Sequence, residues 1–126
     1  MYYLGVRDDF SAAHILKGYD GKCSRLHGHN WKIEAVFRGE ELNSIDISED
    51  FKNLKNALKF VLEEFDHNYL NEIEYFETSN PSAENISRIL NELLQEKIEE
   101  EGYKVEVYEV KVWESDRAWV SFNPYR

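Results

Sequence analysis

The sequence is poor in cysteine: Cys23 is the only one among 126 residues, so no disulfide can form within the chain. Such usage is typical of reducing compartments, and we predict a cytoplasmic protein. The stretch MYYLGVRDDF at the start has neither the basic block nor the apolar run of a signal peptide, and no later stretch is apolar enough to span a membrane. We therefore expect no membrane partner.

Basic residues are also scarce. Lysine and arginine together number 15 against 25 aspartates and glutamates, which gives a net charge of −10. A nucleic-acid-binding protein needs a basic face, so we predict no nucleic-acid partner. An anionic substrate would need a local cluster of cations, for which the candidates are Lys17, Lys22, Arg25 and Lys111.

Proline occurs twice, and no linker, repeat or low-complexity tract divides the chain. A hydrophobic content of 42% and an aromatic content of 14% are typical of a globular protein. Chains of this length usually form one hydrophobic core. We predict a single compact domain over residues 1–126.

Hydrophobic periodicity predicts six elements, because alternating apolar residues indicate strands and a spacing of three to four residues indicates helices. The predicted strands cover residues 3–15, 27–38, 104–114 and 117–122, and the predicted helices begin near residues 51 and 81. A slip in the alternation at Tyr108 and Glu109 suggests a β-bulge. The order strand–strand–helix–helix–strand–strand predicts an α+β fold, with two helices on one face of a four-stranded antiparallel sheet.

Capping residues suggest the helix ends. Asp46 with Glu49 forms a candidate capping box before the first helix. Asn80 suits the N-cap of the second helix, Pro81 its first position and Gly102 its C-terminal end.

Histidine is rare but clustered, since three of the four histidines fall within residues 14–29. Residues two apart on a strand project from the same face, about 6–7 Å apart, so His27 and His29 point the same way. If the first two strands pair antiparallel, His14 lies beside them. Three converging imidazoles are a catalytic zinc set that keeps a fourth position open, although a lone histidine is more often a core or surface residue.

Cys23 has three interpretations on its spacing alone. It is an inert thiol, a fourth zinc ligand that closes the site, or a thiolate base whose pKa is lowered by zinc and by its basic neighbours. Spacing and composition do not separate the last two.

Three further features are candidates for chemistry. Asp66 and His67 are adjacent and form a proton-transfer pair if they hydrogen-bond, though a polar loop that ends a helix explains such a pair more often than catalysis does. Glu114 falls on an apolar strand face, where a carboxylate needs a partner such as the N–H edge of a heterocycle, unless it is a solvated strand end. The stretch from Asn80 to Asn85, which includes Ser82 and Glu84, is either a helix start or part of a pocket.

Together these pieces resemble the 6-pyruvoyltetrahydropterin synthase and 6-carboxytetrahydropterin synthase family. The matching motifs are FSAAH (10–14), CSRLHGH (23–29), DFKNLK (50–55), FDHNYLN (65–71), NPSAEN (80–85) and VWES (112–115). They follow the family order over nearly the whole chain. The run that usually precedes the first helix departs from the family and reads NSIDISEDF here, which touches no proposed catalytic group.

The resemblance implies the tunnelling fold (T-fold) and homo-oligomers, either trimers that close a β-barrel or dimers of such trimers. It implies that His14, His27 and His29 bind Zn²⁺. It further implies that Cys23 is the catalytic base and that Asp66 with His67 is a second proton-transfer unit, contributed across a subunit interface. Glu114 would anchor the pterin ring, and Ser82 and Glu84 would line the substrate pocket.

The implied substrate is 7,8-dihydroneopterin triphosphate. Three residues separate Cys23 from His27, which resembles the 6-carboxytetrahydropterin synthases of 7-deazaguanine (queuosine or archaeosine) synthesis, whose products are 6-carboxytetrahydropterin, acetaldehyde and triphosphate. The alternatives are a 6-pyruvoyltetrahydropterin synthase, an enzyme that cleaves the substrate to a 6-hydroxymethyl pterin, and a non-catalytic binding module stabilised by zinc.

Overall fold

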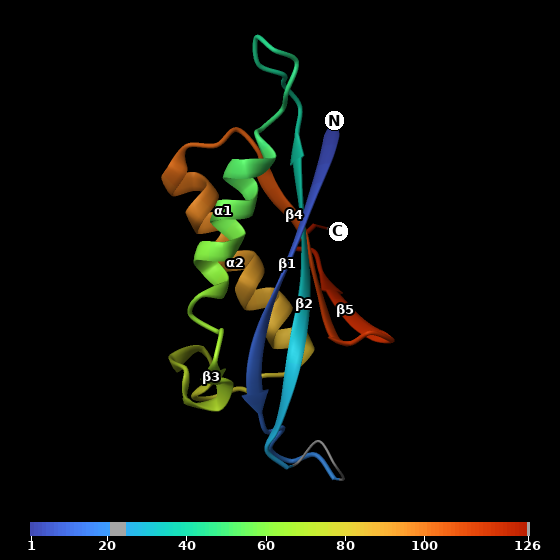
Figure 1. Ribbon diagram of the computed structural model, residues 1–126, viewed down its shortest axis with the longest axis vertical. Helices are drawn as coiled ribbons and strands as arrows, with labels where there is room; N and C mark the ends of the chain where they lie inside the picture. Colours follow the sequence, from blue (N-terminus) through green and yellow to red (C-terminus); the bar gives the residue numbers. More distant parts are fainter. Residues whose placement is uncertain (21–24, 126) are drawn as a thin grey trace.

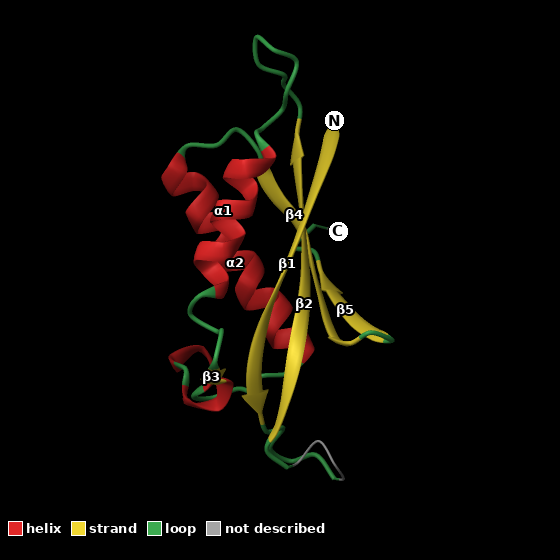
Figure 2. Ribbon diagram, viewed as in Figure 1, coloured by secondary structure: helices red, strands yellow, loops and turns green. Residues whose placement is uncertain are grey.

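The computed structural model describes residues 1–20 and 25–125. Figures 1 and 2 show a sheet with both long helices on the same side of it. The elements in chain order are β1 (Tyr2–His14), β2 (His27–Gly39), α1 (Phe51–Leu62), β3 (Asn68–Tyr69), α2 (Ala83–Glu101), β4 (Glu106–Ser115) and β5 (Ala118–Phe122). Two short 3₁₀ turns, Leu70–Glu72 and Glu74–Phe76, follow β3. The predicted α+β order of the long elements is confirmed.

The sheet has five strands in the order β3-β1-β2-β4-β5, so the prediction of four strands was wrong by one short strand. The four long strands pair antiparallel as predicted, whereas β3 runs parallel to β1 and pairs only with Ala12 and Ala13. Periodicity cannot reveal a strand of two residues. It forms because the Ser11 carbonyl accepts a hydrogen bond from the His67 backbone N–H, at 2.6 Å, which draws the chain after α1 against β1.

Two β-bulges interrupt β4. The register with β2 shifts between Val36 and Phe37, opposite Glu109 and Val107, so Tyr108 is the extra residue and the predicted bulge is confirmed. The register with β5 shifts between Trp113 and Ser115, which makes Glu114 a second extra residue. Bulges turn a strand locally and redirect its side chains, and this one lies at the end of β4 that carries Glu114.

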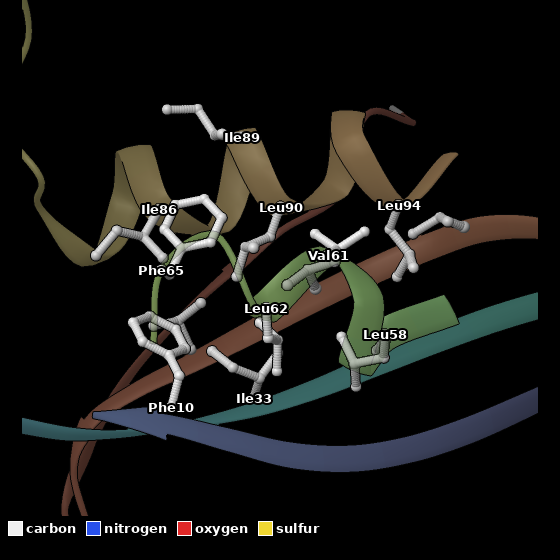
Figure 3. Packing of buried hydrophobic residues seen from close by; sticks show 14 of the residues in the cluster. Phe10, Ile33, Leu58, Val61, Leu62, Phe65, Ile86, Ile89, Leu90 and Leu94 are labelled. Carbon is white, nitrogen blue, oxygen red and sulfur yellow. The ribbon is translucent and has the colours of Figure 1, made fainter. Parts of the chain in front are cut away.

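The core lies between the sheet and the two helices. Phe10 and Ile33 on the sheet face the apolar stripes of α1 and α2, which include Leu58 and Leu90 (Figure 3). Phe65 follows α1 and packs against Phe10, with the ring centroids 5.7 Å apart. The helix-facing side of the sheet is therefore apolar along most of its length, and the polar residues on that side mark an exception.

The helix starts differ from those predicted. Asp50 caps α1 by accepting the Lys52 backbone N–H at 2.8 Å, so the predicted capping box of Asp46 and Glu49 is wrong. Ser82, rather than Asn80, caps α2 by accepting the Asn85 N–H at 3.2 Å. The Asn80 amide is used elsewhere, as described below.

The C-terminal end of α2 agrees with the prediction, because Gly102 adopts the left-handed conformation, with φ of 74°. Such a conformation costs glycine little and terminates the helix. Among the described residues, no helix combines the length and the apolar character needed to cross a membrane.

Candidate metal and catalytic site

Three histidines meet where β1 ends and β2 begins, at the lower end of the sheet in Figure 1. In the antiparallel register His14 pairs with His27, and Ala12 pairs with His29. The ring centroids lie 4.5 Å apart for His14 and His27, 4.5 Å for His27 and His29, and 5.2 Å for His14 and His29. The pairing assumed from the sequence therefore produces the convergence that it predicted.

Backbone carbonyls determine which nitrogen of two rings faces the cluster. His14 Nδ1 lies 2.7 Å from the carbonyl oxygen of Pro81, and His27 Nδ1 lies 2.6 Å from that of Arg25. A carbonyl only accepts hydrogen bonds, so both Nδ1 atoms carry the proton and donate it. In the neutral rings both Nε2 atoms then present lone pairs, and these two atoms are 3.0 Å apart. Two facing lone pairs repel each other unless a cation lies between them.

Glu114 reaches the same cluster from β4. Its Oε1 lies 3.3 Å from His29 Nε2, and both side chains are only partly exposed, at 30% and 22%. That contact is within the range of an ion pair, but His29 Nε2 is buried and has no hydrogen-bond partner among the described residues. A buried nitrogen without a partner, beside a carboxylate, fits a cation that both contact.

The four side chains have the chemistry of a metal site. One donor atom from each of His14, His27, His29 and Glu114 lies within 4.8 Å of the other three. Burial lowers the pKa of His14 and of His29 from the ordinary value of 6.5, which favours the neutral imidazole that binds metals. Zinc accepts such nitrogen and oxygen donors, so the residues present fit the ion that the sequence predicted.

Two asparagines hold the chain that leaves the site, and the sequence did not reveal them. The Asn71 amide accepts the Ile15 N–H at 2.8 Å and donates to the Ile15 carbonyl at 2.9 Å. The Asn80 amide binds the backbone of Lys17 in the same way, at 2.9 and 2.8 Å. Each amide thus pairs with the N–H and the carbonyl of one residue after His14, as a neighbouring strand would. Asn71 lies in a stretch that the sequence showed only as polar, and Asn80 in one interpreted as a helix start or part of a pocket, so only their hydrogen-bond partners reveal this role.

Asp66 and His67 form a pair beside β1. His67 Nδ1 lies 3.0 Å from Asp66 Oδ1, and the same oxygen accepts the Ser11 backbone N–H at 2.9 Å. The Ser11 N–H and, to a smaller extent, His67 lower the pKa of Asp66. The His67 side chain is 82% exposed, and its backbone φ is +59°, a conformation that a non-glycine residue adopts only when its surroundings impose it.

Of the remaining predicted site residues, the structure describes Ser82, Glu84 and Lys111. The Ser82 hydroxyl caps α2, and Glu84 is exposed in the first turn of that helix. Lys111 lies between Trp113 and Trp119, with its Nζ 5.5 and 4.4 Å from their ring centroids, on the sheet face opposite the histidines. Cys23 lies outside the described residues, and so does Lys22.

Comparison with known proteins shows that nearly the whole chain is similar to one protein family. A family model described as 6-pyruvoyl tetrahydropterin synthase matches residues 3–124. A protein of Archaeoglobus fulgidus, provisionally named a 6-carboxy-5,6,7,8-tetrahydropterin synthase, is 35% identical over 121 residues, which cover 95% of this chain and 94% of that protein. A dihydroneopterin monophosphate aldolase of Pyrococcus furiosus is 31% identical over 117 residues, 93% of each chain.

Solved structures resemble the whole chain as well. The 6-pyruvoyl tetrahydropterin synthase of Caenorhabditis elegans superposes with a TM-score of 0.86 at 27% sequence identity, over 98% of this chain and 96% of that one. The predicted fold class is confirmed by this likeness, apart from the additional short strand.

Proposed function

This chain belongs to the 6-pyruvoyl tetrahydropterin synthase family, and from that premise we propose that it is a zinc-dependent 6-carboxy-5,6,7,8-tetrahydropterin synthase. Its substrate would be 7,8-dihydroneopterin triphosphate, and its products 6-carboxytetrahydropterin, acetaldehyde and triphosphate. The product would enter 7-deazaguanine synthesis. The activity would reside in one cytoplasmic domain over residues 1–126.

The observation that carries the proposal is the approach of the Nε2 atoms of His14 and His27, which lie 3.0 Å apart. The buried Nε2 of His29 has no hydrogen-bond partner in the part of the chain that the structure describes. Three such nitrogens would supply the donor set of a catalytic zinc site, in which a further position receives water or substrate. Bound zinc would supply Lewis acidity toward the hydroxyl groups of the substrate side chain.

The other groups would bind the ring and move protons. Glu114 would accept hydrogen bonds from the amino and ring N–H groups of the pterin, because a carboxylate presents two acceptor oxygens to such an edge. Cys23 would take a proton from the substrate side chain as a thiolate. Asp66 holds the Nδ1 side of His67, which leaves the other ring nitrogen to exchange protons with solvent or substrate.

The open edges of the sheet support self-association. On its outer side β1 pairs with β3 only at Ala12 and Ala13, and Ser11 bonds to Asp66 and His67, so the strand before Ser11 has no strand partner on that side in the part of the chain that the structure describes. The opposite edge is β5, whose Trp119 is 54% exposed. Exposed edges of this kind favour pairing with another chain. We expect a trimer or a dimer of trimers, in which the exposed His67 of one chain approaches the site of the next.

Three alternatives differ in product or in chemistry. A 6-pyruvoyl synthase would release triphosphate without acetaldehyde, and the fold of the C. elegans enzyme favours this option equally. An aldolase would yield a 6-hydroxymethyl pterin, an option favoured by the P. furiosus relative. A zinc-stabilised binding module would turn over no pterin.

Mass spectrometry of the products formed by zinc-loaded protein from dihydroneopterin triphosphate tests the proposal. We expect 6-carboxytetrahydropterin together with one acetaldehyde per turnover. Accumulation of 6-pyruvoyltetrahydropterin or of 6-hydroxymethyl pterin would assign the corresponding alternative, and an absence of turnover in fully metallated protein would favour the binding module.

A further inference from the structure

Glu114 continues the strand face of Val110 and Val112, which in the register with β2 is the face of Ala35 and Ile33. It is also the extra residue of the bulge against β5, between Trp113 and Ser115, and its Oε1 lies 3.3 Å from His29 Nε2. Among the described residues, His29 is the one ion-pair partner of Glu114. The end of β4 therefore contributes an acidic side chain to a cluster that otherwise comes from β1 and β2.

The spacing of the four donors matches a closed tetrahedral site. Zinc binds nitrogen and oxygen at about 2.0–2.1 Å, so two donors of a tetrahedral site lie about 3.3–3.4 Å apart. His29 Nε2 and Glu114 Oε1 are 3.3 Å apart, and His14 Nε2 and His27 Nε2 are 3.0 Å apart. These are two opposite edges of one tetrahedron, and the other donor pairs lie within 4.8 Å. Small side-chain adjustments would bring all four donor atoms to tetrahedral spacing.

We propose that Glu114 is a switchable fourth metal ligand, which closes the zinc site in the resting protein and leaves the metal when the pterin ring binds. The inference rests on the proposed function, because it assigns a second role to the carboxylate that anchors the ring. One carboxylate cannot both bind the metal through the oxygen that faces His29 and accept the paired N–H groups of a pterin edge. The substrate hydroxyls would take the vacated metal position.

A negative coupling between metal and ring follows from this competition. A pterin without a side chain needs Glu114 but returns no donor to the metal. Zinc therefore weakens the binding of such a ring, and by thermodynamic reciprocity the ring weakens the binding of zinc by the same factor. A pterin whose side chain carries hydroxyl groups returns donors to the metal, so zinc does not weaken its binding in this way.

The first test measures the zinc affinity of the wild type, Glu114→Gln and Glu114→Ala by competition with a chromophoric chelator. Loss of the fourth donor should weaken zinc binding by about tenfold or more in both variants. The matched control is Asp116→Asn, which removes one negative charge two residues away from an exposed carboxylate paired with Lys32. Its zinc affinity should equal that of the wild type. Thermal unfolding of the metal-free variants verifies that each one folds.

The second test compares the metal-free and zinc-loaded forms of the wild type first and of the variants afterwards. Binding of unsubstituted pterin, followed by its fluorescence, should be about fivefold weaker or more in zinc-loaded wild type than in metal-free wild type. The difference should disappear in Glu114→Gln and persist in Asp116→Asn.

Wild-type zinc affinity in both Glu114 variants, or pterin binding that zinc leaves unchanged or strengthens, would overturn the switch and leave Glu114 as a ring anchor alone. Neither result touches the proposed function, which the product assay decides separately. A wild-type protein that shows the coupling but forms no 6-carboxytetrahydropterin would retain the switch and refute the synthase.

Discussion

The carbonyl oxygen of Pro81 accepts a hydrogen bond from His14 Nδ1 at 2.7 Å, across 67 positions of sequence. This contact joins the segment before α2 to the end of β1, and it leaves His14 Nε2 directed at His27. Metal-binding histidines commonly donate their other ring N–H to a carbonyl in this manner, which fixes the tautomer and the ring orientation. The segment before α2, which the sequence suggested as part of a pocket, therefore orients the His14 ring through the backbone carbonyl of Pro81.

Replacement of His14 by alanine should abolish the stabilisation of the protein by zinc. A ligand that binds only the folded state at 100 times its dissociation constant adds about 2.7 kcal/mol to the free energy of unfolding. Urea titrations with and without zinc measure this increment in the wild type and in His14→Ala. His67→Ala is the control, since His67 lies outside the cluster, and it should keep the full increment. An increment that survives in His14→Ala would remove His14 from the ligand set.

Replacement of Cys23 by alanine should leave zinc content intact while turnover falls by about 10²–10⁴-fold, the usual contribution of a general base. Metal analysis of the purified variant and a product assay measure the two effects separately. Loss of zinc together with loss of stability would identify Cys23 as a ligand and would contradict its role as the base.

Asn71→Ala should lower the free energy of unfolding by about 1–3 kcal/mol, because two hydrogen bonds to Ile15 are lost and each contributes about 0.5–1.5 kcal/mol. Chemical denaturation of the metal-free protein measures the change. Asn56→Ala is a matched control, since Asn56 is exposed in α1, and it should change stability by less than about 0.5 kcal/mol. Equal effects of the two substitutions would show that the Asn71 amide does not hold this segment.

The stability contributed by Asp66 should depend on pH. Its pKa is lowered from 3.8, chiefly by the Ser11 N–H and then by His67, so the unfolded chain binds a proton at this carboxyl more readily than the folded one. The stabilisation is therefore complete above 3.8 and is lost as the pH falls through the lowered pKa of the folded state. The difference in unfolding free energy between the wild type and Asp66→Asn should shrink on acidification. A difference that stays constant over that range would contradict the assignment.

Much of the architecture followed from local patterns. The alternation of His27, His29 and Trp31 specifies which side chains share a face, because successive strand residues point to opposite sides of a sheet. The apolar stripe that includes Leu58 and Leu90 specifies which sides of the two helices are buried. These features depend on neighbours in the chain, so they were predictable without the structure.

The caps and the short strand were less predictable. Asp46 and Glu49 had the composition of a capping box, yet Asp50 occupies the N-cap. Asn80 had the composition of an N-cap, yet its amide binds the backbone of Lys17 and leaves that position to Ser82. Several polar residues near a helix start can serve as caps, and contacts from elsewhere in the fold decide among them.

The sequence by itself determined the composition of the candidate site: three histidines on two adjoining strands, an acid at the end of a third strand, and an Asp-His pair. Only the tertiary structure decided how these groups meet. The Pro81 carbonyl selects the His14 nitrogen that faces the cluster, and the pairing of β4 with β2 brings the Glu114 carboxylate to His29. The reason is that residue type and spacing are local properties, whereas a tautomer and the direction of a side chain depend on atoms supplied by distant parts of the chain.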